Sequence, residues 1–265
     1  MKLKQKLFKF PFIVELWELP NRRVVWGIST IIGLFFVLIL TLILNPDGRM
    51  AALILDRRSP HFQYPFTIQN FEHVIFFIGL GELYIRWRVA ERELGFLKMN
   101  LLPEEESAVL QSADLVPIRR RVSKMYSNEH GFLPSLVDLS ILQFQSGRSV
   151  DQTVAVMSSS LELIQHRVDL RYSIIRYIAW FVPTLGFIGT VMGLGASLAS
   201  VPMEGEIKMG ILAKTLAVGF DCTMVALVES ALIVLLLHII QEMEELSVNH
   251  VGTYTLKNLI NRLYV

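Results

Sequence analysis

The sequence predicts an all-α membrane protein with four transmembrane helices and a helical cytoplasmic domain between the second and the third. Three observations support this fold class. Hydrophobic residues make up 52% of the 265 residues and charged residues only 18%, whereas a soluble domain usually carries about 25% charged residues. The mean hydropathy is +0.47. Apolar runs of membrane-spanning length lie on both sides of one long polar stretch.

The composition also excludes several classes of protein. The chain has 25 Lys+Arg and 24 Asp+Glu, so it lacks the positive charge of a nucleic-acid-binding protein. Cys222 is the single cysteine, which rules out an internal disulfide and a cysteine-based metal site. The histidines show no pair at the spacing of a helical metal site, and no phosphate-binding loop or nucleophile elbow is present. We therefore expect no metal, no cofactor and no enzymatic activity.

Two spans are predicted before the polar stretch. The uncharged segment Val24–Leu44 has the length of about 20 residues that a bilayer core requires, and Asn45–Gly48 ends it. Positive residues before this span place the N-terminus in the cytoplasm, and we expect no removable signal peptide. Phe66–Ile85 is a weaker span, because two glutamates and a histidine interrupt it. An amphipathic helix at the membrane surface is the alternative for this segment.

Residues 86–175 are predicted to form the helical cytoplasmic domain. Leu102–Glu106 is typical of a helix start, since acidic residues favour the N-terminal end of the helix dipole. From Ser149 onward, apolar residues recur every three or four positions, and no proline or glycine interrupts them before Pro183. We therefore expect one long helix that enters the membrane near Arg176.

The last two spans are predicted within residues 176–265. Ile178–Ser200 is the third span, and a short outer turn leads to the apolar segment Met209–Ile240. At about 1.5 Å rise per residue this segment is longer than a bilayer requires, so its inner end is expected to project into the cytoplasm. Both termini are then cytoplasmic, and the chain divides into the parts 1–85, 86–175 and 176–265.

Small residues form a stripe along each of these two spans. One stripe contains Gly186, Thr190, Gly193 and Ser197, and the other contains Thr215, Gly219, Cys222 with Thr223, Ala226 and Ser230. The spacing leaves two alternatives open: a tight, dry contact between helices, or the wall of a narrow polar passage. Pro183 is expected to bend the third span and release a backbone carbonyl.

The third span resembles a known family. Residues 183–193 read PTLGFIGTVMG and are similar to the PxxGLxGTVxG segment of the MotA/TolQ/ExbB proton-channel family, with Phe187 in place of leucine. The fourth span resembles the family's ALxxTAxGL segment more loosely around Thr223, and Thr215 is the alternative threonine. The resemblance covers about residues 150–245. Four spans are typical of the MotA branch and Gly189–Thr190 of the TolQ and ExbB branch, so the branch stays open.

The resemblance implies a function. In this family five copies surround two single-span partner helices of the MotB/TolR/ExbD type, each of which brings a membrane aspartate that is protonated or binds sodium. The third and fourth spans line the pore, and ion flow moves the ring relative to the partner. We therefore expect a homopentameric stator subunit of an ion-driven motor in the lipid bilayer of the bacterial inner membrane. The machine that it drives and the ion, H⁺ or Na⁺, stay open.

The resemblance also implies roles for individual residues. Hydroxyl groups for the partner carboxylate, or for an ion that sheds water, are expected from Thr190, Thr223 and, as the alternative, Thr215. Gly186, Gly189 and Gly193 are expected to leave room for the partner helix, and Pro183 is expected to supply a flexible point.

Two acidic residues of the fourth span need a separate explanation. Asp221 lies about 18 Å along the helix from Met209, near mid-membrane, where a charge costs roughly 2.5–3.5 kcal/mol. It is expected to be paired, with Lys214 or His73, or to take part in ion transfer. Glu229 lies near the inner mouth and is expected either to collect cations that leave the passage or to be an ordinary carboxylate in interfacial water.

A passive membrane scaffold is the rival function from a different class. Its glycine stripes would only pack helices, and its middle domain would recruit cytoplasmic proteins. An autonomous channel without a second protein is a further alternative. A pure packing contact tolerates alanine at Thr190 and Thr223, whereas an ion path does not, so these two residues distinguish the alternatives.

Overall fold

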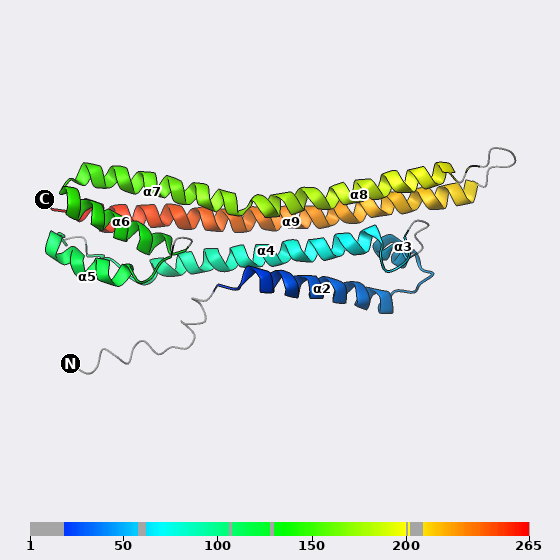
Figure 1. Cartoon of the computed structure of the whole chain (residues 1–265), viewed down its shortest axis with the longest axis horizontal. Helices are drawn as coiled ribbons and strands as arrows, with labels where there is room; N and C mark the ends of the chain where they lie inside the picture. The colour runs from blue at the N-terminus through cyan, green and yellow to red at the C-terminus, as the bar shows by residue number, and fades with distance from the viewer. Residues whose placement is uncertain are drawn as a thin grey trace, which may run out of the picture. The chain divides into compact units, whose positions relative to one another are not determined.

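The computed structural model describes residues 19–57, 62–105, 108–127, 130–199, 201 and 209–264, and the side chains at 211, 214 and 215 lie outside this description. Over the described residues the chain is all-helical and forms no strand, as the sequence predicts (Figure 1). The elements are α2 Arg22–Ile43, α3 Arg49–Leu55, α4 Ile68–Leu97, α5 Ser112–Val122, α6 Phe132–Gly147, α7 Val150–Arg171, α8 Ser173–Ala199, α9 Met209–Asn258 and the 3-10 turn η1 Ile260–Arg262.

The chain divides into two compact units. The first contains Pro20–Ile85 and Ser173–His238, and the second contains Arg86–Tyr172 and the chain from Ile239 onward. Helices α4 and α9 each contribute to both units. The C-terminal end of α9 belongs to the same unit as residues 86–172, and the parts 1–85, 86–175 and 176–265 stay a prediction.

Three helical segments of the described chain are long and apolar enough to cross a membrane. They are Arg22–Ile43, Val150–Ala199 and Leu216–Arg262. Helix α4 is not among them, because polar side chains in its first two turns lower its hydropathy. The predicted crossing at Phe66–Ile85, and with it the count of four spans, therefore stays a prediction.

Most predicted helices form, with changes at their ends. Helix α2 begins after Asn21, whose side chain accepts the N–H of Arg23 at 3.0 Å, and it ends before the predicted Asn45–Gly48 turn. The long helix expected from Ser149 is broken at Tyr172 into α7 and α8. Helix α9 continues beyond Ile240 to Asn258.

The helix predicted to start at Leu102–Glu106 is wrong. The described residues 101–105 are not helical, and the next helix begins at Ser112. Arg262 donates to the carbonyl oxygens of Pro103 at 2.7 Å and of Glu104 at 3.2 Å. These carbonyl groups are thus bound by a distant side chain rather than by the N–H groups of a helical turn.

Buried polar contacts hold the second unit together. The Glu93 carboxylate accepts the backbone N–H groups of Gly131 and Phe132, at 2.8 and 2.7 Å, and so caps the start of α6. Burial raises the pKa of Glu93, and these two hydrogen bonds oppose the rise. Tyr172 is fully buried at the break between α7 and α8, and its hydroxyl donates to Glu244 at 2.8 Å.

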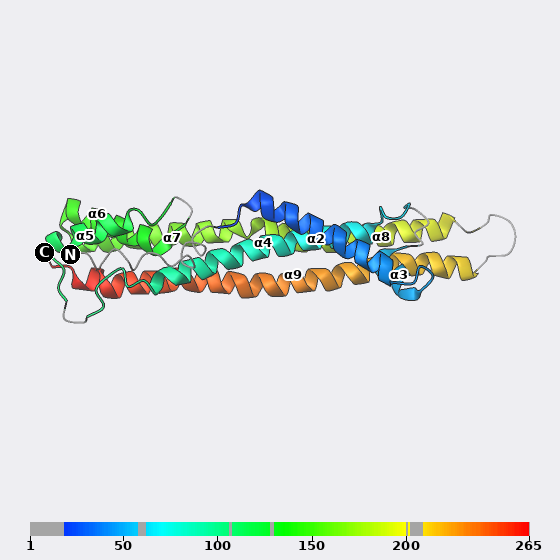
Figure 2. The same cartoon turned by 90° about the horizontal axis from the view of Figure 1, so that it is seen from below.

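In the first unit, α2 lies against α4 (Figures 1 and 2). A Cβ atom at Gly33 of α2 would lie 3.1 Å from the Cα of Val74, which shows how closely the two backbones approach. Nearer the start of α2, Arg22 and Trp26 donate to the Glu82 carboxylate at 3.0 and 2.8 Å. This contact balances the charge of a carboxylate that is fully buried.

Candidate functional site at the contact between α8 and α9

The two stripes of small residues face each other within one chain. Figure 1 shows α8 running alongside the first half of α9. A Cβ atom at Gly186 would lie 2.6 Å from the Cβ of Ala226, and one at Gly219 would lie 3.1 Å from the Cα of Thr190. A Cβ at Gly189 would overlap the sulfur of Cys222. The glycines therefore allow a close contact between α8 and α9, which is the first of the two alternatives for the stripes.

Thr190 and Thr223 meet in this contact, and their hydroxyl groups are hydrogen-bonded to each other. The Thr190 Oγ1 also lies 2.8 Å from the carbonyl oxygen of Gly219, and the Thr223 Oγ1 lies 2.8 Å from that of Gly186. The two hydroxyl groups have only two protons for these three contacts. Each proton can therefore go either to a carbonyl oxygen or to the oxygen of the other threonine. The four oxygen atoms can accept hydrogen bonds or coordinate a cation, and the hydroxyl groups can exchange their hydrogen bonds by rotation.

The contact also distinguishes the two candidates, Thr223 and Thr215, for the threonine of the fourth span. Thr223 is the residue that reaches Thr190. The side chain of Thr215 lies outside the described residues.

Both threonines are half-buried, so one side of the pair is open in the single chain. Large apolar residues three positions before and four positions after each threonine lie on the same helix face as that threonine. These residues are exposed: Phe187 64%, Leu194 40%, Phe220 57% and Leu227 54%. The hydroxyl pair therefore lies in an uncovered surface that is otherwise apolar.

Asp221 forms an ion pair that the sequence did not predict. Its carboxylate lies 2.7 Å from the guanidinium of Arg49, at the start of α3. The prediction of His73 as its partner is wrong, because His73 contacts Glu229, and the side chain of Lys214 lies outside the described residues. No element is predicted between the spans Val24–Leu44 and Phe66–Ile85, whereas α3 forms there and brings Arg49 to α9.

Glu229 is buried rather than surrounded by interfacial water. Only 8% of its surface is exposed, and its carboxylate lies 2.5 Å from the Nδ1 atom of His73. The Nε2 atom of His73 lies 2.9 Å from the carbonyl oxygen of Ile54. The sequence does not predict this contact, although the adjacent residues Glu72 and His73 in an apolar segment are a signal that polar partners exist elsewhere in the fold.

Three consecutive residues of α9 bind three different elements. Asp221 contacts Arg49 of α3, Cys222 donates to Glu72 of α4 at 3.6 Å, and Thr223 contacts Thr190 of α8. Helix α9 thus connects the two threonine hydroxyl groups to two ionisable contacts, the ion pair of Asp221 with Arg49 and the hydrogen bond from Cys222 to Glu72. Within the described residues no three His, Cys, Asp or Glu side chains could hold a metal ion.

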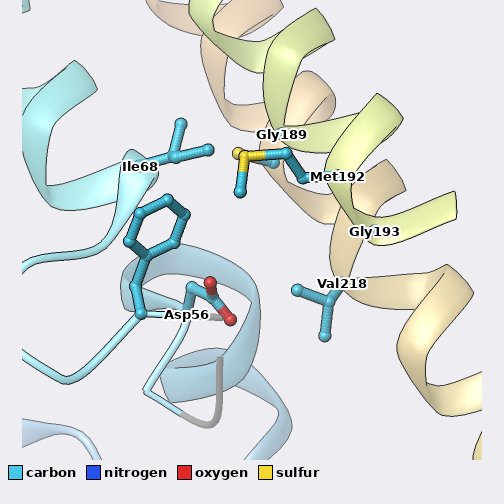
Figure 3. A pocket seen from close by; sticks show the side chains of 8 residues that line it. Asp56, Ile68, Gly189, Met192, Gly193 and Val218 are labelled. Carbon is cyan, nitrogen blue, oxygen red and sulfur yellow. The ribbon is translucent and has the colours of Figure 1, made fainter. Parts of the chain in front are cut away.

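A small cavity lies beside the contact between α8 and α9 (Figure 3). Its volume is about 20 Å³, enough for about one water molecule. Figure 3 shows the carboxyl group of Asp56 directed into the space near Met192 and Val218. The lining residues are Asp56, Phe62, Ile68, Gly189, Met192, Gly193, Val218 and Cys222. The cavity therefore touches the residues next to both threonines, Gly189 and Cys222.

Comparison with known proteins agrees with the resemblance. The model of the MotA/TolQ/ExbB proton channel family matches residues 127–251, a range that contains Thr190, Thr223, Asp221 and Glu229. The match confirms the predicted resemblance for this segment. No curated protein and no solved structure matches the chain.

Proposed function

From the match of residues 127–251 to the MotA/TolQ/ExbB proton channel family, we propose that this chain is the pore-forming subunit of an ion-driven membrane motor. The family consists of membrane channels that transduce energy, not of enzymes. The working complex is a homopentamer around two single-span helices of the MotB/TolR/ExbD type in the bacterial inner membrane, with the chain termini in the cytoplasm. It carries protons or sodium ions, converts their gradient into motion and needs no cofactor.

The contact between Thr190 and Thr223 is the observation on which the proposal depends. It brings two hydroxyl oxygens and two carbonyl oxygens together in an apolar helix pair. Oxygen atoms of this kind replace the water that an ion loses on entering a pore, and hydroxyl groups can both donate and accept a hydrogen bond.

The exposed surface around the threonines supports an assembly. Phe187 and Leu194 flank Thr190, and Phe220 and Leu227 flank Thr223, and all four are exposed in the single chain. A helix that covers this surface buries apolar side chains and places its own polar group at the hydroxyl pair. An aspartate on a single-span partner helix would meet the two threonines in this way.

Replacement of Thr190 by valine tests the function. Valine keeps the volume of threonine and removes the hydroxyl, so Thr190→Val is expected to abolish proton flux while the complex still assembles. Flux is measured with a pH-sensitive dye in vesicles that contain the chain and its co-purified single-span partner. Thr184→Val is the matched control, because the Thr184 hydroxyl donates to Trp180 of its own helix, at 2.9 Å. Full flux in Thr190→Val contradicts the proposal.

A passive scaffold is the second candidate, and one observation favours it. The small residues of α8 and α9 already pack against each other inside one chain, so they need no further partner. A scaffold tolerates the double change of Thr190 and Thr223 to alanine with unchanged partner binding and shows no flux in any variant. An ion path loses its flux with these changes.

A further inference from the structure

The interface between α4 and α9 in the first unit contains ionisable groups that the proposed function does not use. Glu72 is fully buried, and His73 and Glu229 are 3% and 8% exposed. Charges inside a membrane protein are costly unless they are paired or neutralised by a proton. Each of these groups therefore needs a partner or a proton.

His73 and Glu229 satisfy each other. The carbonyl oxygen of Ile54 can only accept, so the Nε2 atom of His73, 2.9 Å away, carries a proton. The remaining proton of the pair lies between Nδ1 and the Glu229 carboxyl, which are 2.5 Å apart. The pair is neutral in total whichever of the two atoms holds that proton.

Glu72 has no such partner in the described part of the chain. Within that part its Oε1 atom accepts only the weak S–H donor of Cys222, at 3.6 Å. Its Oε2 atom is buried and has no hydrogen-bond partner among the residues that the structure describes. Gln69, one turn earlier on the same face of α4, is also fully buried, and its amide atoms find no partner within the described ranges. Glu82 differs, because Arg22 and Trp26 bind this equally buried carboxylate.

The groups that surround Glu72 do not favour a second negative charge. Helix α9 brings Glu229 and Cys222 to Glu72, and two further acids, Asp56 and Asp221, lie near Cys222. His73 follows Glu72 in α4 and contacts Glu229. Among the described side chains near these groups, Arg49 is engaged with Asp221 and His73 with Glu229. Arg57, which follows Asp56, donates to the carbonyl oxygens of Thr41 and Leu44. Helix α8 faces the cavity beside Cys222 with Gly189, Met192 and Gly193, which carry no charge.

We propose that Glu72 is a proton-binding residue, so that each subunit holds an exchangeable proton at the α4–α9 interface beside the contact of the two threonines. The proton is taken up from hydronium, which leaves as water, and converts the carboxylate to a neutral carboxylic acid. The site goes beyond the proposed function and does not depend on it, because the burial of Glu72 is a property of the single chain.

The position of Cys222 gives this proton a polar exit. Cys222 contacts Glu72, precedes Thr223 in α9 and lines the cavity that has room for about one water molecule. Asp56 also lines this cavity, and Figure 3 shows its carboxyl group directed into the space. A proton that leaves Glu72 by way of Cys222 thus reaches a small cavity in which Asp56 offers a further carboxyl group.

Infrared spectroscopy of the purified full-length protein in lipid vesicles tests the proposal. At neutral pH the wild type is expected to show the carbonyl stretch of a protonated carboxylic acid, which shifts in D₂O. Glu72→Gln is expected to remove the equivalent of one carboxylic acid per chain from this band. Glu82→Gln is the matched control and leaves the band unchanged. A wild type without the band, or a band that keeps its full area in Glu72→Gln, overturns the proposal.

A second variant decides the question if Glu72→Gln does not fold. Cys222→Ala keeps the acid and removes its S–H donor, so the band is expected to stay and to shift in frequency. An unshifted band in Cys222→Ala shows that the protonated acid is another residue and overturns the proposal. The flux test on Thr190→Val is independent, since it reports conduction and the infrared band reports protonation.

Discussion

The contact of Thr190 with Thr223 depends on nearby glycines, which have no side chain to hold the two helices apart. The Thr190 hydroxyl lies 2.8 Å from the Gly219 carbonyl because the backbones of α8 and α9 approach closely at Gly186 and Gly219. A residue larger than glycine at these positions has to push the helices apart. The glycines thus position the hydroxyl groups, although they bind no ion themselves.

Gly186→Ala is expected to weaken this contact. The new Cβ would lie 2.6 Å from the Cβ of Ala226 and 3.0 Å from the Cα of Thr223, so the backbone has to move. We expect a loss of about 1–3 kcal/mol in the free energy of unfolding, and a lower proton flux. Thermal unfolding of the purified protein measures the first effect.

Gly195→Ala is the control for this change on the same helix. A Cβ at Gly195 meets no atom within 4 Å, so the substitution leaves the helix contact intact. Equal unfolding temperatures for Gly186→Ala and Gly195→Ala would show that the close approach of α8 and α9 does not limit stability.

At the scale of the elements, the ion pair of Arg49 and Asp221 links α3 to α9. Asp221 is buried, whereas the Arg49 side chain is 64% exposed, so solvent screens the pair and its contribution is modest, on the order of 1 kcal/mol. Removal of either partner should therefore loosen α3 rather than unfold the helix pair.

Asp221→Asn is expected to lower the unfolding temperature slightly and to leave proton flux in the assembled complex unchanged. Arg49→Gln is expected to cost more, because it leaves the buried carboxylate of Asp221 without its cation. The double variant should cost less than the sum of the two single changes. Normal stability with lost flux in Asp221→Asn would instead assign Asp221 to ion transfer.

The sequence predicts those elements whose signal is local. Apolar runs predict α2, α8 and the first half of α9, and the glycine and threonine pattern predicts the positions that the family match covers. Helix α3 has only seven residues and no periodic signal, so its position depends on tertiary contacts. These are the ion pair of Arg49 with Asp221 and the hydrogen bonds of the Leu55 and Ile54 carbonyl oxygens with Thr67 and His73. The break at Tyr172 has no proline or glycine signal either. It coincides with the buried bond between Tyr172 and Glu244, which lie far apart in the sequence.

Partners of buried charges could not be predicted for the same reason. The sequence shows that Asp221, Glu72 and Glu229 are costly in an apolar segment, but their partners come from other elements. The pairs of Asp221 with Arg49 and of Glu229 with His73 bring together residues that lie more than one hundred positions apart. Only the packing of α3, α4 and α9 selects these partners among the available cations.

At the scale of the whole molecule, a single chain leaves the hydroxyl pair uncovered. The surface beside Thr190 and Thr223 is apolar and exposed on both α8 and α9. In an isolated subunit, half-buried hydroxyl groups would face hydrocarbon, where polar groups without full partners are unfavourable. Neighbouring copies and a partner helix would cover this surface, so the proposed ion path is a property of an assembly.

The subunit composition of the purified complex is the most direct test of the motor account. The chain is co-expressed with the candidate single-span protein, extracted in detergent and analysed by native mass spectrometry. The account predicts five copies of this chain with two copies of a single-span partner, and this stoichiometry should persist in Thr190→Val. A monomer or dimer without any single-span partner would contradict the account and would favour the passive scaffold.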